Sequence, residues 1–133
     1  MECSFYVLSN GMKLENVLPK LLAKIYSLGH KVNLRVDSKE RLEQLDHLLW
    51  TTTRDFLPHG TTHGHLQPIY LSTSCENPNQ ATVLLVTPGA DETANNYEKY
   101  LGFIIEDDIP LYKNQYQNAK FFIFDKTWSV LDS

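Results

Sequence analysis

Three histidines lie close together in the segment His59-Gly60-Thr61-Thr62-His63-Gly64-His65. Imidazole is a common ligand of zinc and other divalent metals, so His59, His63 and His65 are candidate metal ligands. A stable metal site usually adds a carboxylate or thiolate from another element, and no Cys or Glu stands nearby in the sequence. The sequence therefore favours a solvated loop and keeps a metal-binding enzyme as an alternative.

A second place for chemistry is the turn after the first predicted strand, Ser9-Asn10-Gly11-Met12-Lys13. This turn binds nucleotide phosphates in many α/β proteins, but here it has one glycine and matches neither GxGxxG nor GxxxxGK[ST]. A mononucleotide at the following helix N-terminus stays an alternative. Cys75 lacks a neighbouring His and no GxSxG motif occurs. The residues predict no catalytic side chain, no metal and no cofactor.

Aromatic and cationic side chains remain as candidates for protein binding. Trp50 follows an amphipathic pattern, and Phe56-Leu57-Pro58-His59 comes shortly after it in a stretch without periodicity. Exposed aromatic pairs are typical of protein interfaces. Lys113, Tyr116 and Lys120 recur at helical spacing, so one helix face would offer cations and an aromatic ring to an acidic peptide. The alternative, which these residues alone favour, is a plain solvated helix face.

Alternating apolar patterns predict the elements that position these side chains. The sequence indicates one α/β domain over residues 1–133, with a mostly parallel sheet and helices on both faces. Pro19 lies inside the first helical pattern, so that helix either starts there or is kinked. Residues 51–67 are predicted to be a long loop. Strands are predicted over 4–8, 31–36, 69–71, 82–86, 102–105 and 120–124, and helices over 14–28, 37–50, 93–101 and 108–117.

Composition narrows the class of partner. The chain has 133 residues and a formal net charge of −4, which argues against strong direct binding to nucleic acid. No signal peptide and no membrane-spanning apolar run is recognisable, and the two cysteines are too few for a disulfide framework. We therefore expect a soluble protein of a reducing cytoplasm that does not bind membranes.

The order of several motifs is specific enough to suggest a family. The chain resembles the chi subunit of bacterial DNA polymerase III, an accessory protein of the clamp-loader complex, from about residue 4 to residue 124. The most specific part combines the end of the second predicted helix with the segment that follows it. The matching segments are Phe5-Tyr6-Val7-Leu8, Gly29-His30-Lys31-Val32, Leu45-Asp46-His47-Leu48-Leu49-Trp50 and Asp55-Phe56-Leu57-Pro58-His59-Gly60.

The resemblance implies a Rossmann-like fold without nucleotide binding or catalysis. It implies two partners: the psi subunit of the clamp loader and the acidic C-terminal tail of single-stranded DNA-binding protein (SSB), which the chain bridges during DNA replication. Trp50, Phe56, Pro58 and His59 match the psi side. The tail side matches Lys113, Tyr116, Gln117 and Lys120, with Ile104 or Ile105 as an apolar wall. Lys113 and Gln117 stand where the family usually has Arg and Lys, which removes a bidentate donor and one charge.

Overall fold

The computed structural model describes residues 2–8, 13–52, 58–91, 94, 97–125 and 127–130. The described helices are α1 (Leu14–Ser27), α2 (Lys39–Thr52) and α3 (Ile109–Gln115), with short 3-10 turns η1 (Gly64–Leu66) and η2 (Glu106–Asp108). The described strands are β1 (Glu2–Leu8), β2 (Val32–Arg35), β3 (His59–Gly60), β4 (Ile69–Ser72), β5 (Val83–Val86), β6 (Lys99–Ile105), β7 (Lys120–Asp125) and β8 (Thr127–Val130).

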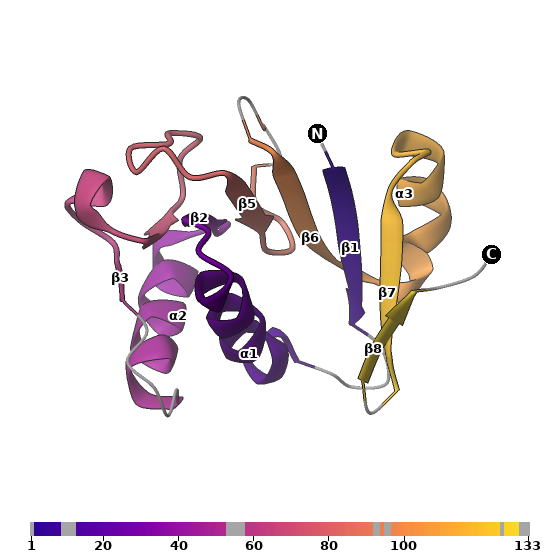
Figure 1. The fold of residues 1–133 in the computed structure, drawn as a ribbon. Coiled ribbons are helices and arrows are strands. Elements are labelled where there is room, and N and C mark those ends of the chain that lie inside the picture. Colours follow the sequence, from indigo (N-terminus) through magenta and orange to yellow (C-terminus); the bar gives the residue numbers. More distant parts are fainter. Residues whose placement is uncertain are drawn as a thin grey trace.

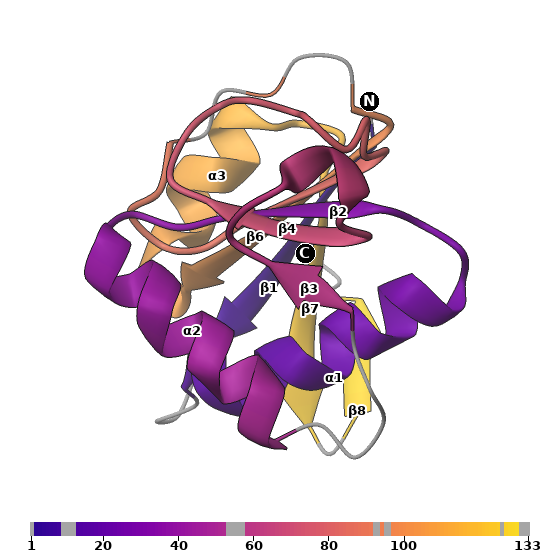
Figure 2. The same cartoon turned by 90° about the vertical axis from the view of Figure 1, so that its left-hand side faces the viewer.

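These strands form one sheet in the order β3-β4-β2-β5-β6-β1-β7-β8 (Figure 1). Every neighbouring pair is parallel except β7 and β8, which are antiparallel. Parallel strands need helical crossovers that cover the faces of the sheet. Figure 2 shows α1 and α2 on one side of the sheet and α3 on the other. The prediction of an α/β fold with a mostly parallel sheet between helices is confirmed.

The face under α1 and α2 holds the larger apolar core. Helix α1 buries Leu14, Leu18, Leu21, Leu22 and Ile25, the three- and four-residue spacing that puts leucines on one side of a helix. They pack with apolar side chains of α2, β2, β4, β5 and β6. The central strands β2 and β5 are buried at every position, as expected of parallel strands covered on both faces.

The opposite face holds a second core under α3. Its centre is Phe5 of β1, whose ring centroid lies 5.4 Å from that of Phe121 and 5.0 Å from that of Tyr112. Gly102 of β6 leaves room for this ring, since a Cβ at Gly102 would lie 2.9 Å from two Phe5 ring carbons. The glycine is therefore required by close packing rather than by a turn.

Buried amides attach the connection between β4 and β5 to this face. The Asn33 Nδ2 atom donates to Asn77 Oδ1 at 2.8 Å and lies 2.7 Å from the Tyr97 hydroxyl. Asn79 Nδ2 donates to the carbonyl of Gln67 at 2.9 Å. A buried polar group costs free energy unless it is hydrogen-bonded, so these contacts fix an irregular segment in place.

Several predicted boundaries need correction. Helix α1 begins at Leu14 and continues through Pro19, so it does not start at the proline. The predicted helix over 93–101 is wrong at its end, because Lys99 and the two residues after it belong to strand β6. The predicted loop over 51–67 contains strand β3, which pairs with β4. None of the helices in the described part of the chain is long and apolar enough to cross a membrane.

Candidate functional site

The end of α2 presents a large aromatic side chain that rests on a buried histidine. Trp50 is 51% exposed, whereas His59 of β3 is only 4% exposed. Their ring centroids lie 4.3 Å apart at an interplanar angle of 40°. Helix α2 and β3 are brought together here because β3 adds to the edge of the sheet beside β4, next to the face that α2 covers. Trp50 and His59, which the resemblance in sequence placed on one partner-binding surface, are therefore in contact.

Asp46, one helical turn before Trp50, contacts the buried His59 ring. The His59 Nε2 atom lies 3.3 Å from the Asp46 carbonyl oxygen and 3.4 Å from Asp46 Oδ1. Because the His59 side chain is fully buried, it supports the indole rather than meeting a partner directly. Sequence reasoning missed Asp46 as a functional residue, although it stands within the Leu-Asp-x-x-Leu-Trp motif.

Of the other two residues predicted for this surface, the structure describes Pro58 but not Phe56. Pro58 is partly buried immediately before His59. Phe56 lies outside the described residues, so its predicted place beside Trp50 stays a prediction. What the described part offers is a half-exposed indole on a rigid support, an arrangement typical of a protein-binding anchor.

A second surface surrounds α3. Tyr112 and Tyr116 stack with ring centroids 6.0 Å apart, and each also contacts the Phe5 ring. The Lys113 ammonium lies over the Phe121 ring at 5.8 Å from its centroid, within reach of a cation–π attraction. Lys113 and Tyr116 thus lie on the same face of the sheet, at the edge of an aromatic cluster.

The remaining residues predicted for this surface do not all join it. The expectation that Lys120 continues a helix face is wrong, because α3 ends at Gln115 and Lys120 begins β7. Phe121 packs on the α3 face, so the alternation of a strand puts Lys120 on the opposite face. Ile104 is 4% exposed in the α3-face core, whereas its neighbour Ile105 is 50% exposed. Gln117 is exposed just beyond the helix.

The small size of the cavity beside α3 limits how a ligand could bind to this surface. It measures about 20 Å³ and its lining includes Phe5, Pro88, Ile104 and Tyr112. A space of this size accommodates about one water molecule and no aromatic ring. Because the protein's own rings fill the face, a peptide would lie over Lys113 and Tyr116 rather than insert a side chain deeply without movement of α3.

The three histidines of the alternative metal site do not converge. His59 is buried against Trp50, whereas His63 and His65 are exposed around η1. His63 adopts a left-handed backbone conformation with φ of 52° and its ring lies 3.3 Å from the Thr62 hydroxyl. No group of three His, Cys, Asp or Glu side chains in the described ranges could hold a metal ion.

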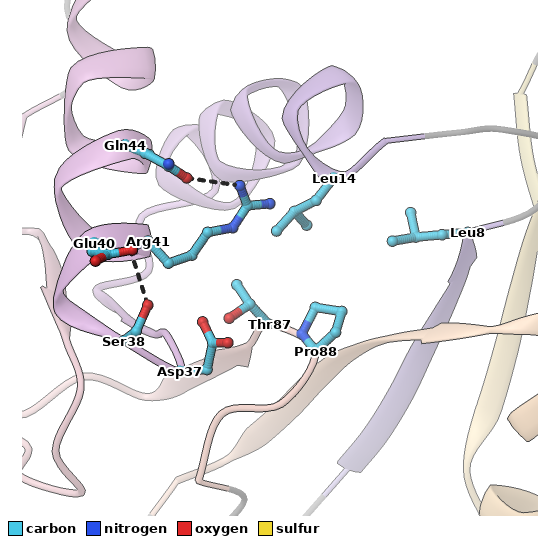
Figure 3. A pocket seen from close by; sticks show the side chains of 9 residues that line it. All are labelled: Leu8, Leu14, Asp37, Ser38, Glu40, Arg41, Gln44, Thr87 and Pro88. Atoms are coloured by element: carbon cyan, nitrogen blue, oxygen red, sulfur yellow. Dashed lines mark hydrogen bonds between the residues drawn. The ribbon is translucent and has the colours of Figure 1, made fainter.

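A crevice of about 350 Å³ opens at the carboxyl ends of β1, β2 and β5, where α/β proteins often bind ligands (Figure 3). Its charged lining residues are Asp37, Glu40 and Arg41. The Arg41 guanidinium pairs with Glu15 Oε1 at 2.5 Å and with Gln44 Oε1 at 3.3 Å. Two carboxylates and an arginine that is already paired are poorly suited to a phosphate. Residues 9–12 of the predicted nucleotide turn lie outside the described part.

Glu15 at the start of α1 is the partner of the arginine that lines this crevice. The pKa of its carboxyl is lowered by a hydrogen bond from its own backbone N–H and, to a smaller extent, by Arg41. Both effects favour the carboxylate at a helix N-terminus. The ion pair is therefore explained by the start of α1 and by its contact with α2, without a ligand.

Comparison with known proteins gives a consistent result. The family model for the DNA polymerase III chi subunit, HolC, matches residues 1–120. A curated protein of Rickettsia prowazekii (strain Madrid E), "Probable DNA polymerase III subunit chi", is 34% identical over 92 residues, which cover 66% of this chain. The aligned part spans 55% of that relative's own length.

Proposed function

Because the chain belongs to the DNA polymerase III chi subunit family, we propose that it is a non-catalytic accessory subunit that bridges two partners in the cytoplasm of a bacterium. One partner is a psi-type subunit of the clamp loader, and the other is the acidic C-terminal tail of SSB. The observation that carries this proposal is the half-exposed Trp50 held on the buried His59 ring. A rigid, exposed indole loses little conformational entropy on binding.

The psi side is assigned to Trp50 and Pro58, with His59 beneath them and Phe56 added from the family motif. A partner that covers the indole removes a large apolar surface from water, which favours binding. The tail side is assigned to Lys113, Tyr116 and Gln117, with Ile104 in the core beneath this face. A cation over an aromatic cluster suits a peptide that combines acidic residues with a terminal aromatic side chain and a free carboxylate.

These two sides lie at different parts of the sheet. Trp50 and β3 are at one end of the strand order, whereas β1 and β7 under α3 are near the other end. Such separation allows both partners to bind at once, which is what a bridging subunit requires.

The psi side is tested by binding of a purified psi subunit to the full chain and to Trp50→Ala. We expect the variant to lose at least about tenfold in affinity, because anchoring aromatic residues typically contribute 2 kcal/mol or more. Tyr26→Ala removes another exposed aromatic side chain, on α1, and serves as the matched control. Equal affinity of Trp50→Ala and the unaltered chain would exclude this surface.

The tail side is tested by titration with a labelled peptide ending in Asp-Asp-Ile-Pro-Phe with a free carboxylate. We expect saturable, salt-sensitive binding that weakens in Lys113→Ala and in Tyr116→Ala and needs the terminal Phe. Lys39→Ala, an exposed lysine at the start of α2, is the control. Binding that persists without the Phe would contradict the assignment.

A further inference from the structure

A groove on the α1 face of the sheet is separate from both surfaces described above. It has a volume of about 200 Å³ and lies between the second half of α1 and the first residues of β1, β6 and β7. Its floor includes Ser4, Tyr6 and Phe122, and its wall includes Leu28, which is 64% exposed. A cavity of this size suits one or two side chains rather than a whole small-molecule ligand.

Two lysines line this groove, and a third stands on a neighbouring strand of the same face. Lys24 and Lys99 line it directly. Lys120 of β7 stands in register with Ser4 of β1. Two residues further on, Tyr6 of β1 stacks on Phe122 of β7, so Lys120 and Ser4 point to the same face of the sheet as these two rings. The chain as a whole carries a net charge of −4. The groove therefore concentrates positive charge on an otherwise acidic protein.

One acidic side chain, Glu2, also lines the groove, in register with Lys99. It offsets one of the three lysines, and His30 also lines the groove. The His30 Nδ1 atom lies 3.3 Å from the Thr82 hydroxyl. The cations are thus placed around an apolar interior, where they complement an acidic chain that carries an apolar side chain.

The aromatic residues of the floor distinguish a peptide from a nucleic acid. Tyr6 lies between two rings, with its centroid 5.1 Å from that of Phe122 and 5.9 Å from that of Phe103. Proteins that bind single-stranded nucleic acid offer open ring faces on which bases stack. Here the rings of neighbouring strands pack on one another across the sheet, so the floor is suited to a bulky side chain rather than to a stacked base.

From this geometry we infer that the groove between α1 and β1 binds an extended acidic peptide segment through one bulky apolar side chain, with Lys24, Lys99 and Lys120 contacting its carboxylates. Lys120 belongs to this site and not to the α3 surface, because the two lie on opposite faces of the sheet. The segment needs no free C-terminus, since its apolar side chain enters the groove and its acids lie along the rim. Exposed ion pairs contribute little individually, so the apolar side chain supplies most of the affinity.

The test is an NMR titration of the full chain with the blocked peptide acetyl-Glu-Asp-Phe-Asp-Glu-amide. We expect saturable shifts in the second half of α1 and at the first residues of β1, β6 and β7, and none in α3. The peptide has no terminal carboxylate, so the tail surface around Lys113 is not expected to bind it. The result is therefore independent of whether that surface binds an SSB tail.

Variants decide which residues are responsible. Lys99→Ala combined with Lys120→Ala should weaken binding about fivefold or more, and Leu28→Ser should weaken it similarly without touching the buried core. Lys113→Ala is the matched control and should bind as the unaltered chain does. Replacing the peptide's Phe by Ala should abolish the shifts.

Three outcomes would overturn the inference. The first is the absence of shifts at millimolar peptide. The second is shifts confined to α3. The third is saturable binding of an eight-nucleotide thymidine oligomer at the groove while the acidic peptide fails, which would assign the groove to nucleic acid.

Discussion

The structure gives His59 a different role from those that the sequence suggested for it. In the sequence it is one of three clustered histidines, or part of a partner-binding turn; in the structure its ring is buried between Asp46 and the exposed Trp50. A buried, hydrogen-bonded imidazole fixes the position of the indole above it. Its contribution to binding is therefore through the orientation of Trp50.

Replacing His59 by alanine should affect both stability and the environment of Trp50. We expect the free energy of unfolding to fall by about 1–3 kcal/mol, because a buried hydrogen-bonded ring is lost. In a Trp128→Phe background, the Trp50 fluorescence should also shift to longer wavelength. Urea unfolding and emission spectra measure the two effects. His63→Ala, which alters an exposed histidine, should change neither; an equal effect of both variants would refute the supporting role of His59.

Glu15 makes a pH-dependent contribution whose sign follows from its pKa. Since the folded-state pKa is lowered, first by its own backbone N–H and then by Arg41, the carboxylate stabilises the fold above its unfolded pKa of about 4.3. This stabilisation is lost as the pH falls through the folded-state value. The side chain is 36% exposed, so solvent screening limits the effect to under about 1 kcal/mol.

The corresponding measurement compares urea unfolding of the unaltered chain and Glu15→Gln from pH 7 to pH 2.5. The difference should be largest at neutral pH and disappear at the acid end. Glu43→Gln, at an exposed position on α2, gives the baseline. A difference that grows as the pH falls would contradict the direction of the pKa shift.

At the scale of elements, β1 and β6 fit together because the Phe5 ring of β1 packs over Gly102 of β6, which has no side chain. Phe5 of β1 is 1% exposed and stacks on Phe121, so it has no free direction in which to move. Gly102 of β6 provides the space it occupies. The register of the two strands is therefore specified by shape as well as by backbone hydrogen bonds.

Gly102→Ala should accordingly destabilise the protein by about 1–3 kcal/mol, as expected of an overpacked core. Gly60→Ala is a useful control, because its Cβ would also be close to a neighbour, 2.7 Å from Gln67 Nε2, but that neighbour is the end of a flexible side chain. Thermal or urea unfolding should show a small change for Gly60→Ala. Equal losses for the two variants would mean that Phe5 can rearrange.

The elements also show where sequence patterns are informative. The leucine spacing of α1 and the apolar run of β5 each follow from one local rule, and both were predicted. The strand predicted over 102–105 is the second half of β6, but the helix predicted over 93–101 is wrong at its end, because β6 begins at Lys99 through its parallel pairing with β1 and β5, which no local pattern encodes. Strand β3 was missed for a similar reason, since its two residues become a strand only by pairing with β4.

At the scale of the whole molecule, the same limit applies to the candidate surfaces. The pairing of Trp50 with His59 was predictable from their motif, but the burial of His59 was not. The separation of Lys120 from Lys113 depends on where α3 ends and on the alternation of β7, and it reassigns a residue from one face of the sheet to the other. The α1 groove had no signal in the sequence, because its lysines come from three elements that are distant along the chain.

The strand order predicts which strands exchange their amide hydrogens slowly and which exchange them fast. Strands β2, β5, β6 and β1 are the four central strands, each separated from an edge by at least one other strand, whereas β3 and β8 are the edges of the described sheet. Hydrogen-exchange mass spectrometry should therefore show the slowest exchange in β1, β2, β5 and β6, and the fastest among strands in β3 and β8. Rapid exchange of β1 together with β3 would contradict a central position for β1.

The position of β1 has a consequence for synthesis on the ribosome. Of the described strands β1 is made first, yet it pairs with β6 and β7, which are made long after it. At roughly 5–20 residues per second, its apolar side chains wait several seconds or longer before either partner strand emerges. During that interval β1 is an unpaired apolar segment of the nascent chain, which makes it a natural site for chaperone contact. The final fold is completed only when the C-terminal third encloses the first strand.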